Sequence, residues 1–326
     1  MDPIVLTHKN TAEGCKFIMD FTFRCGHSVP LYDISTTGAL NQLIGHAKVA
    51  NSQYGNVYYR GVDGLYDNVM PSLMRNKTSG SCDDLHVVLN AVCGDAYFHK
   101  SLKLRDTIIP QAPQDYEYKK RITRYNKYCV EALLQHYAGS TRFLDVVDNH
   151  WVALWMGAHR FWLHGKGGKF CQIKERKLNI GSLYEEILST KKADLQKKIY
   201  EYIILVAMPY PETPPEHGII ETENLVEVDL RKVFPSFYLR PHAQHALVVR
   251  RRDKQNINQI ASYYDMASQV VAILRVRIDR AYEWLGRGSL LSEDNLFPSP
   301  SIDQGYNNLL MHQDIFTYPF EILKYY

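Results

Sequence analysis

Hydrophobic periodicity changes part-way along the 326-residue chain, and this change limits the possible folds more than any other feature. Before about residue 163, apolar residues recur every three or four positions, most clearly over 115–137 and 148–163, which predicts amphipathic helices. Later, short apolar runs bounded by turn residues predict strands, of which 202–208 is the strongest. We therefore expect an α+β fold with a helix-rich N-terminal half packed on a mainly antiparallel sheet.

Capping and turn residues give bounds to other elements. Ser35-Thr36-Thr37 predicts the start of a helix that runs to about Ala50, and Asp148 predicts the N-cap of the helix over 148–163. Gly61 is expected to end a strand over 57–60. The other predicted elements are a helix over 83–104, strands over 225–228, 246–249 and 270–278, and a short helix over 279–285.

Composition indicates a folded, water-soluble protein, because 45% of the residues are hydrophobic and 22% are charged. The first residues lack a basic stretch followed by an apolar one, and the longest strongly apolar run, Ile203–Met208, is too short to span a bilayer. The six cysteines form no CxxC pair and match no zinc spacing. These features predict a cytoplasmic protein with reduced thiols and no membrane partner, and leave the oligomeric state open.

The tripeptide Tyr59-Arg60-Gly61 closes one of the strand-like runs. A guanidinium at a strand end can bind a phosphate or a carboxylate through two parallel hydrogen bonds. Gly61 allows a ligand or a backbone to approach closely. The alternative is an arginine bound to a structural carboxylate. Arg60 is the first candidate for catalysis and ligand binding.

The segment Gln135–Asp145 is mostly polar or small, and it lies between two amphipathic segments. Histidine can titrate near neutral pH, tyrosine can stack on a ring, and hydroxyls suit a ribose or a phosphate. Its candidate residues are His136, Tyr137, Ser140, Thr141 and Arg142. Arg142 and Asp145 could form an internal ion pair or contact the ligand. The alternative is a buried polar turn that holds two helices together.

A third polar segment, Arg240–His245, leads into the predicted strand 246–249 and resembles the rim of a binding site. Gln244 is its candidate functional residue. His242 and His245 are three positions apart without a neighbouring carboxylate, so we expect no metal site here.

The stretch 159–177 carries six lysines and arginines against Glu175, and aromatic residues lie between them. Such a stretch could contact the phosphate backbone of a nucleic acid. A solvated loop is the alternative, with a flexible turn expected over 164–169.

Four blocks of the chain, in order, resemble the FRG domain, a family named for its Phe/Tyr-Arg-Gly motif. They are Tyr59-Arg60-Gly61 with Pro71–Leu73 and Arg75; Leu134–Tyr137 with Thr141–Asp145 and Ala153–Trp155; Arg240 with Gln244; and Leu285-Gly286 with Leu296–Pro298. The second block departs from the family at Ala138, where glycine is usual. The resemblance implies an FRG-like domain over 35–310, an N-terminal extension over 1–34 and a tail over 311–326.

The order of these blocks also has a distant similarity to ADP-ribosyltransferases of the Arg-Ser-Glu type. This similarity implies that NAD is the cofactor, that Arg60 binds its phosphates and that Ser140 or Thr141 contacts the ribose. Gln244 stands where those enzymes have a catalytic glutamate. The implied function is ADP-ribose transfer to a protein or nucleic-acid acceptor, or NAD hydrolysis, in phage defence or a toxin–antitoxin system. The alternative is a non-catalytic module that binds a nucleotide or a nucleic acid. On this reading the catalytic residues are Arg60, His136, Thr141 and Gln244, and the nucleotide-binding residues are Arg60, Gly61, Tyr137, Ser140, Thr141 and Arg142.

Overall fold

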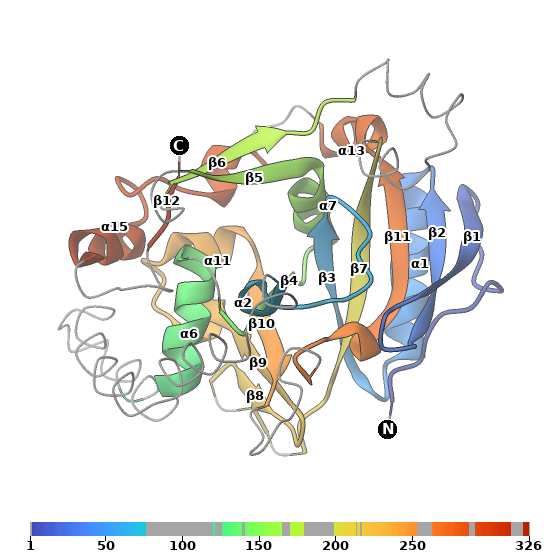
Figure 1. Ribbon diagram of the computed structural model, residues 1–326, viewed down its shortest axis with the longest axis horizontal. Helices are drawn as coiled ribbons and strands as arrows, with labels where there is room; N and C mark the ends of the chain where they lie inside the picture. The colour runs from blue at the N-terminus through green and yellow to red at the C-terminus, as the bar shows by residue number, and fades with distance from the viewer. Residues whose placement is uncertain are drawn as a thin grey trace.

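The computed structural model describes residues 2–75, 120, 126–138, 141–164, 170–178, 199–212, 214–215, 217–252, 263–286, 291–313 and 322–325. Most of its strands form one large sheet (Figure 1). The strands of this sheet are β1 (Cys15–Thr22), β2 (Ser28–Ile34), β3 (Gly55–Val62), β4 (Leu144–Val147), β7 (Tyr200–Pro209), β8 (Ile219–Glu221), β9 (Leu225–Asp229), β10 (Ala246–Arg251) and β11 (Val270–Arg277). A smaller sheet contains β5 (His159–His164), β6 (Phe170–Glu175) and β12 (Lys324–Tyr325).

Helices lie between these strands. Those described are α1 (Thr37–Ala50), α2 (Ser72–Arg75), α6 (Asn126–Tyr137), α7 (His150–Ala158), α10 (Leu230–Val233), α11 (Leu239–Ala243), α13 (Ile278–Leu285), α14 (Glu293–Leu296) and α15 (Gln304–Met311). In the part of the chain that the structure describes, none of them combines the length and apolar character that crossing a bilayer requires.

The order of the large sheet is β1-β2-β11-β7-β3-β4-β10-β9-β8. Its described pairings are antiparallel except that of β2 with β11, so the sheet is mixed. β3 pairs with β7 over eight residues, but with β4 through the single pair Tyr59↔Val147. The sheet therefore divides along the line between β3 and β4, and this line positions the candidate site.

The expected α+β class is confirmed, but the expectation of a helix-rich N-terminal half is wrong for the described residues. Before residue 165, four strands of the large sheet and β5 accompany α1, α2, α6 and α7. β2 has four consecutive buried residues, and so short an apolar run does not separate a strand from a helix by its period. The helix expected over 83–104 lies outside the described residues.

Where capping chemistry guided the bounds, the outcome was mixed. Thr36 caps α1 as expected, because its hydroxyl accepts from the Ala39 amide at 3.1 Å. The cap of α7 is Asn149, whose side chain accepts from the Trp151 amide at 3.0 Å. The predicted cap, Asp148, instead contacts Arg231 and His245.

Several element bounds also differ from expectation. The helix expected over 148–163 ends at Ala158, and the residues that follow form β5, not helix. β3 continues through Gly61 to Val62, so Gly61 does not end it. The later strands expected over 202–208, 225–228, 246–249 and 270–278 are confirmed as β7, β9, β10 and β11.

The helices α1, α6 and α7 all cover one face of the large sheet. α1 and α7 pack on β3, β7 and β11, while α6 packs on β9 and β10. The opposite face of the sheet is concave. The evidence is that the Tyr58 hydroxyl on β3 donates to the Glu227 carboxyl on β9 at 2.6 Å. Three strand spacings of about 4.8 Å separate β3 from β9, so a flat sheet would hold these side chains far apart.

A buried carboxyl on the helix-covered face leads to a stability prediction. Glu201 on β7 is 0% exposed, and its oxygens have no hydrogen-bond partner among the described residues. Burial raises its pKa well above the ordinary value, although Arg176 opposes the shift. Removing unsatisfied buried acceptors should be stabilising, so we expect Glu201→Met to raise the free energy of unfolding by about 1–3 kcal/mol near neutral pH.

The pH dependence of this stability gain tests whether the gain comes from removing the buried Glu201 carboxyl. A raised carboxyl pKa favours the protonated folded state, so the wild type loses stability as pH rises above the pKa of the unfolded chain. The gain in Glu201→Met should therefore shrink when urea unfolding is repeated at about pH 4. Glu201→Gln should show a smaller gain with the same pH trend. An equal gain at both pH values would contradict a neutral, buried Glu201.

Candidate functional site

Arg60 lies where β3 and β4 separate. Strand alternation puts its side chain on the same face as Tyr58, and its Nη1 atom donates to the backbone oxygen of Asp145 on β4 at 2.7 Å. The guanidinium thus binds a carbonyl at the division of the sheet and directly contacts the segment Gln135–Asp145. The two motifs that sequence reasoning singled out separately are brought together here.

A chain of side-chain hydrogen bonds orients the carboxyl of Asp145. Gln135 Nε2 on α6 donates to Asp145 Oδ2 at 2.5 Å, and the Thr141 hydroxyl donates to Gln135 Oε1. Thr141 Oγ1 also accepts from the Phe143 amide at 3.1 Å. Thr141 is buried, whereas Gln135 and Asp145 are half-buried. The network therefore presents a fixed carboxyl at a partly accessible position.

A second arginine lies near the first. Arg75, at the end of α2, is exposed, and Tyr66 beside it is 46% exposed. Burial and the like charge of Arg75 together lower the pKa of Arg60 to about 10, although Asp145 and Tyr66 oppose the shift. Arg60 therefore stays charged at neutral pH.

The charges around Arg60 are not balanced. Among the described residues, no carboxylate lies within 4.0 Å of the guanidinium of Arg60 or of Arg75. Burial raises the pKa of Asp145, although Arg60, Gln135 and Arg75 oppose the shift. Two guanidiniums and one oriented carboxyl give this place an excess of positive charge, which suits an anion. We call Arg60, Arg75, Tyr66, Gln135 and Asp145 the Arg60 site.

Arg142 is not part of this site. It is 1% exposed, and it forms an ion pair with the completely buried Glu131 on α6, with Nη2 and Oε2 at 2.6 Å. The Arg142 amide also donates to Glu131 Oε1 at 2.9 Å. The internal ion pair that we considered between Arg142 and Asp145 is therefore wrong, because the partner is Glu131.

His136 and Tyr137 lie in a buried cluster around Arg240 on α11. The Arg240 guanidinium carbon is 4.2–5.3 Å from the centres of four rings, and Nη1 donates to the His136 backbone oxygen at 3.1 Å. The rings are those of Tyr137, Phe297, Tyr306 and Tyr325. Burial and Arg240 lower the pKa of His136 to about 3, so it is neutral near pH 7.

The expected roles of His136 and Tyr137 in ligand binding stay predictions, and this placement does not favour them. Tyr137 is 0% exposed, and its hydroxyl donates to Asp303 at 2.7 Å. An enclosed ring has no free face for a ligand to stack on.

The other predicted site residues have clear positions. Gln244 is buried, and its Nε2 donates to the Leu296 backbone oxygen at 2.6 Å, so its amide is already used within the fold. Gly61 lies against α7, where a Cβ atom would come within 1.8 Å of the Ala153 oxygen. Ser140 lies outside the described residues. No group of three or more His, Cys, Asp or Glu among the described residues could hold a metal ion.

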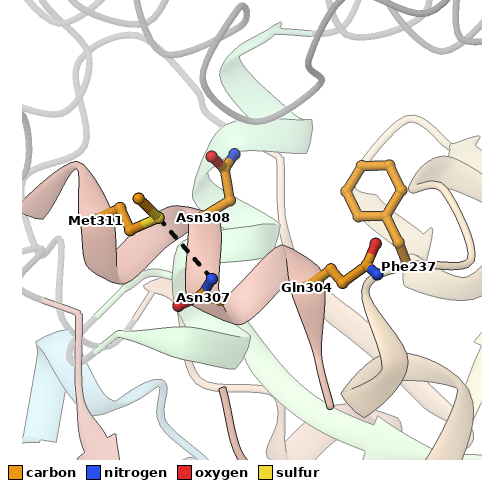
Figure 2. Close-up of a pocket in the computed structure, with 5 residues that line it drawn as sticks. All are labelled: Phe237, Gln304, Asn307, Asn308 and Met311. Carbon is orange, nitrogen blue, oxygen red and sulfur yellow. Dashed lines mark hydrogen bonds between the residues drawn. The ribbon is translucent and has the colours of Figure 1, made fainter. Parts of the chain in front are cut away.

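The surface also has a pocket of about 240 Å³. Figure 2 shows four of its lining residues on α15, with Gln304 next to Phe237. The four are Gln304, Asn307, Asn308 and Met311. None of the sequence-predicted site residues lines this pocket, and we assign no function to it.

Residues 55–160 match the model of one protein family, the FRG domain. The chain carries an FRG domain. The match starts at the first residue of β3 and ends in β5, so the FRG domain contains every residue of the Arg60 site. The comparison with curated proteins found no match, and neither did the comparison with solved structures.

Sequence reasoning did not assign roles to three residues of the Arg60 site. Gln135 belongs to the polar segment, yet only its hydrogen bonds to Thr141 and Asp145 reveal its positioning role. Tyr66 and Arg75 follow β3 in a segment without periodicity. The signal that could have found Arg75 is its place in the first FRG block, shortly after Arg60.

Proposed function

We propose that the FRG domain of this chain binds a nucleotide through its phosphate groups at the Arg60 site, with NAD as the candidate ligand. The supporting observation is the pair of guanidiniums, Arg60 and Arg75, without a carboxylate in ion-pair distance among the described residues. Arginine binds phosphate through two parallel, charge-assisted hydrogen bonds. Tyr66 would lie at the edge of the bound nucleotide.

The chemistry that we propose is ADP-ribosyltransferase-like. The bond between nicotinamide and the ribose carbon would break, nicotinamide would leave, and the acceptor would bond to that carbon and lose a proton. A carboxylate stabilises the positive charge that develops on the ribose. We assign this role to Asp145 instead of Gln244, because Asp145 is oriented beside Arg60 whereas the Gln244 amide is bound to Leu296.

If the protein binds NAD but does not convert it, the domain would be a nucleotide-binding module, which is the second candidate function. The acceptor and the setting in phage defence or a toxin system stay predictions from the family resemblance. Binding and catalysis can be separated by two substitutions in the Arg60 site.

We expect Arg60→Ala to weaken NAD binding by roughly 10- to 150-fold, since it removes charge-assisted hydrogen bonds worth about 1.5–3 kcal/mol. Isothermal titration with NAD and with ADP-ribose measures this loss. The matched control is Arg24→Ala, which removes an arginine that is exposed and paired with Asp67. Equal affinity in wild type and Arg60→Ala, with both folded by circular dichroism, would refute the site.

The second substitution is Asp145→Asn, which keeps the shape and removes the charge. If the site is catalytic, this variant should bind NAD within a few-fold of wild type but release nicotinamide at a rate lower by about 100-fold or more. Nicotinamide release is measured by chromatography, with labelled NAD to follow transfer to protein or RNA. Binding without turnover in the wild type would leave only the module function.

A further inference from the structure

The small sheet has one face that points away from the core. In β5 and β6 the pairs Arg160↔Lys174, Trp162↔Gln172 and His164↔Phe170 share this face, because side chains alternate along each strand. β12 adds Lys324, which pairs with Phe170. The alternate residues lie on the opposite face, where Ile173 and Cys171 are buried while Phe161 and Leu163 are 41% and 59% exposed. The outer face therefore contains Arg160, Trp162, His164, Phe170, Gln172, Lys174 and Lys324.

Rings and cations alternate on this outer face. The Lys174 ammonium is 5.9 Å from the Trp162 ring centre, and the Lys324 ammonium is 5.9 Å from that of Phe170. Trp162 is 49% exposed, which is unusual for so large an apolar side chain. Figure 1 shows the β5–β6 hairpin crossing the end of the large sheet near α7 and α13.

The described residues of the outer face include no carboxylate. Glu175 pairs with His159 and so points to the opposite face. The nearest described carboxylate is that of Asp63, 3.8 Å from Arg160 Nε at the end of the hairpin. Positive charge thus surrounds two exposed or half-exposed aromatic rings. Such a surface suits a polyanion that carries planar rings.

We infer that the outer face binds single-stranded nucleic acid. Bases would stack on Trp162 and Phe170, and phosphates would lie against Lys174, Lys324 and Arg160. Diagonal neighbours on paired strands, such as these two rings, are about 7–8 Å apart, so each can hold a different base. A duplex hides the faces of its bases and offers only its phosphates. The inference does not depend on nucleotide binding at the Arg60 site.

Fluorescence anisotropy with a labelled 20-nucleotide oligo(U) and oligo(dT), using the full chain, tests the inference. Trp162→Ala should weaken binding by about 5- to 150-fold, which corresponds to loss of one stacked base. Trp162→Phe should keep most of the affinity. Lys174→Ala should reduce the slope of log affinity against log salt by about 0.7, the change expected for one phosphate contact.

Two controls match these substitutions elsewhere on the surface. Tyr210 is an aromatic residue with 52% exposure that directly follows β7, whereas the opposite end of that strand, at Tyr200, accepts a hydrogen bond from Arg176 next to β6. Lys16 is an exposed lysine on β1. We expect Tyr210→Ala and Lys16→Ala to bind as wild type does, and circular dichroism to show that all variants fold.

Three outcomes would overturn the inference. One is the absence of wild-type binding at low salt. Another is equal affinity for the oligonucleotide and for a duplex of the same length, which would show phosphate attraction without stacking. The third is binding to anionic lipid vesicles in preference to either nucleic acid. Because Arg60→Ala should leave oligonucleotide affinity unchanged, failure here and failure of the Arg60 site are distinguishable.

Discussion

Glu131→Gln is expected to lower the free energy of unfolding by about 3–5 kcal/mol. Glu131 is 0% exposed and faces the buried guanidinium of Arg142 at 2.6 Å. The equally buried Arg250 acts on it as well. Neutralising the carboxylate removes the negative charge that Glu131 provides to two buried guanidiniums, and taking one partner away from a buried ion pair is strongly destabilising.

Urea unfolding of Glu131→Gln and of Asp67→Asn makes the comparison direct. Arg24 and Asp67 form an ion pair of 2.7 Å, close to the 2.6 Å of the buried pair, but their side chains are 60% and 51% exposed. Exposed pairs contribute about 0–1 kcal/mol, so Asp67→Asn should have little effect. Similar losses in both variants would mean that burial does not decide the strength of these pairs.

The pH dependence of this pair follows from the direction of its pKa shift. Burial alone would raise the pKa of Glu131, but Arg142 and Arg250 outweigh it and hold the pKa below the ordinary value. A lowered carboxyl pKa contributes stability above the pKa of the unfolded chain, and this contribution is lost as pH falls through the folded pKa. The difference between wild type and Glu131→Gln should therefore narrow in acid.

Gly61→Ala is expected to destabilise the protein by about 3 kcal/mol or more, the upper end of the range for overpacking. An added Cβ would lie 1.8 Å from the Ala153 oxygen and 2.8 Å from the Gly157 amide nitrogen. Both obstacles are backbone atoms of α7, so no side chain can turn aside, and α7 would have to move away from β3. Since β3 carries Arg60, ligand affinity should fall along with stability.

Gly45→Ala is the matched control, measured by thermal and urea unfolding. Gly45 lies within α1, and a Cβ atom there would meet nothing within 4 Å. Alanine favours helix over glycine by about 0.5–1 kcal/mol, so this variant should be more stable than wild type. A small effect at Gly61 would show that the glycine of the Tyr-Arg-Gly motif is needed for the ligand and not for close packing.

Sequence reasoning predicted the features that are determined by residues close together in the sequence. The strand 202–208 is apolar throughout because β7 is buried in the middle of the sheet, and Thr36 signals α1 because its hydroxyl caps the first turn. Both effects act over a few residues. The FRG resemblance likewise followed from local blocks and agrees with the family match over 55–160.

Features set by distant residues were not predictable in this way. Arg142 has the same side-chain chemistry as Arg60, yet one faces Glu131 in the core and the other lies at a division of the sheet. Nothing in the sequence indicated that the Gln244 amide donates to the Leu296 backbone oxygen, 52 positions away. The hairpin of β5 and β6 was expected as helix and loop. The spacing of its aromatic residues does not distinguish a strand from a helix.

The parallel pairing of β2 with β11 has a consequence for synthesis of the chain. Arg275 on β11 binds Asp33 on β2, 242 positions earlier in the chain. The pairing of β11 with β2 joins the N-terminal hairpin of β1 and β2 to the rest of the sheet. At about 5–20 residues per second, a ribosome needs roughly 12–50 s to bring the two together. During that time β2 presents an unpaired edge, and in the cell a chaperone or another chain can reach it before its own partner exists.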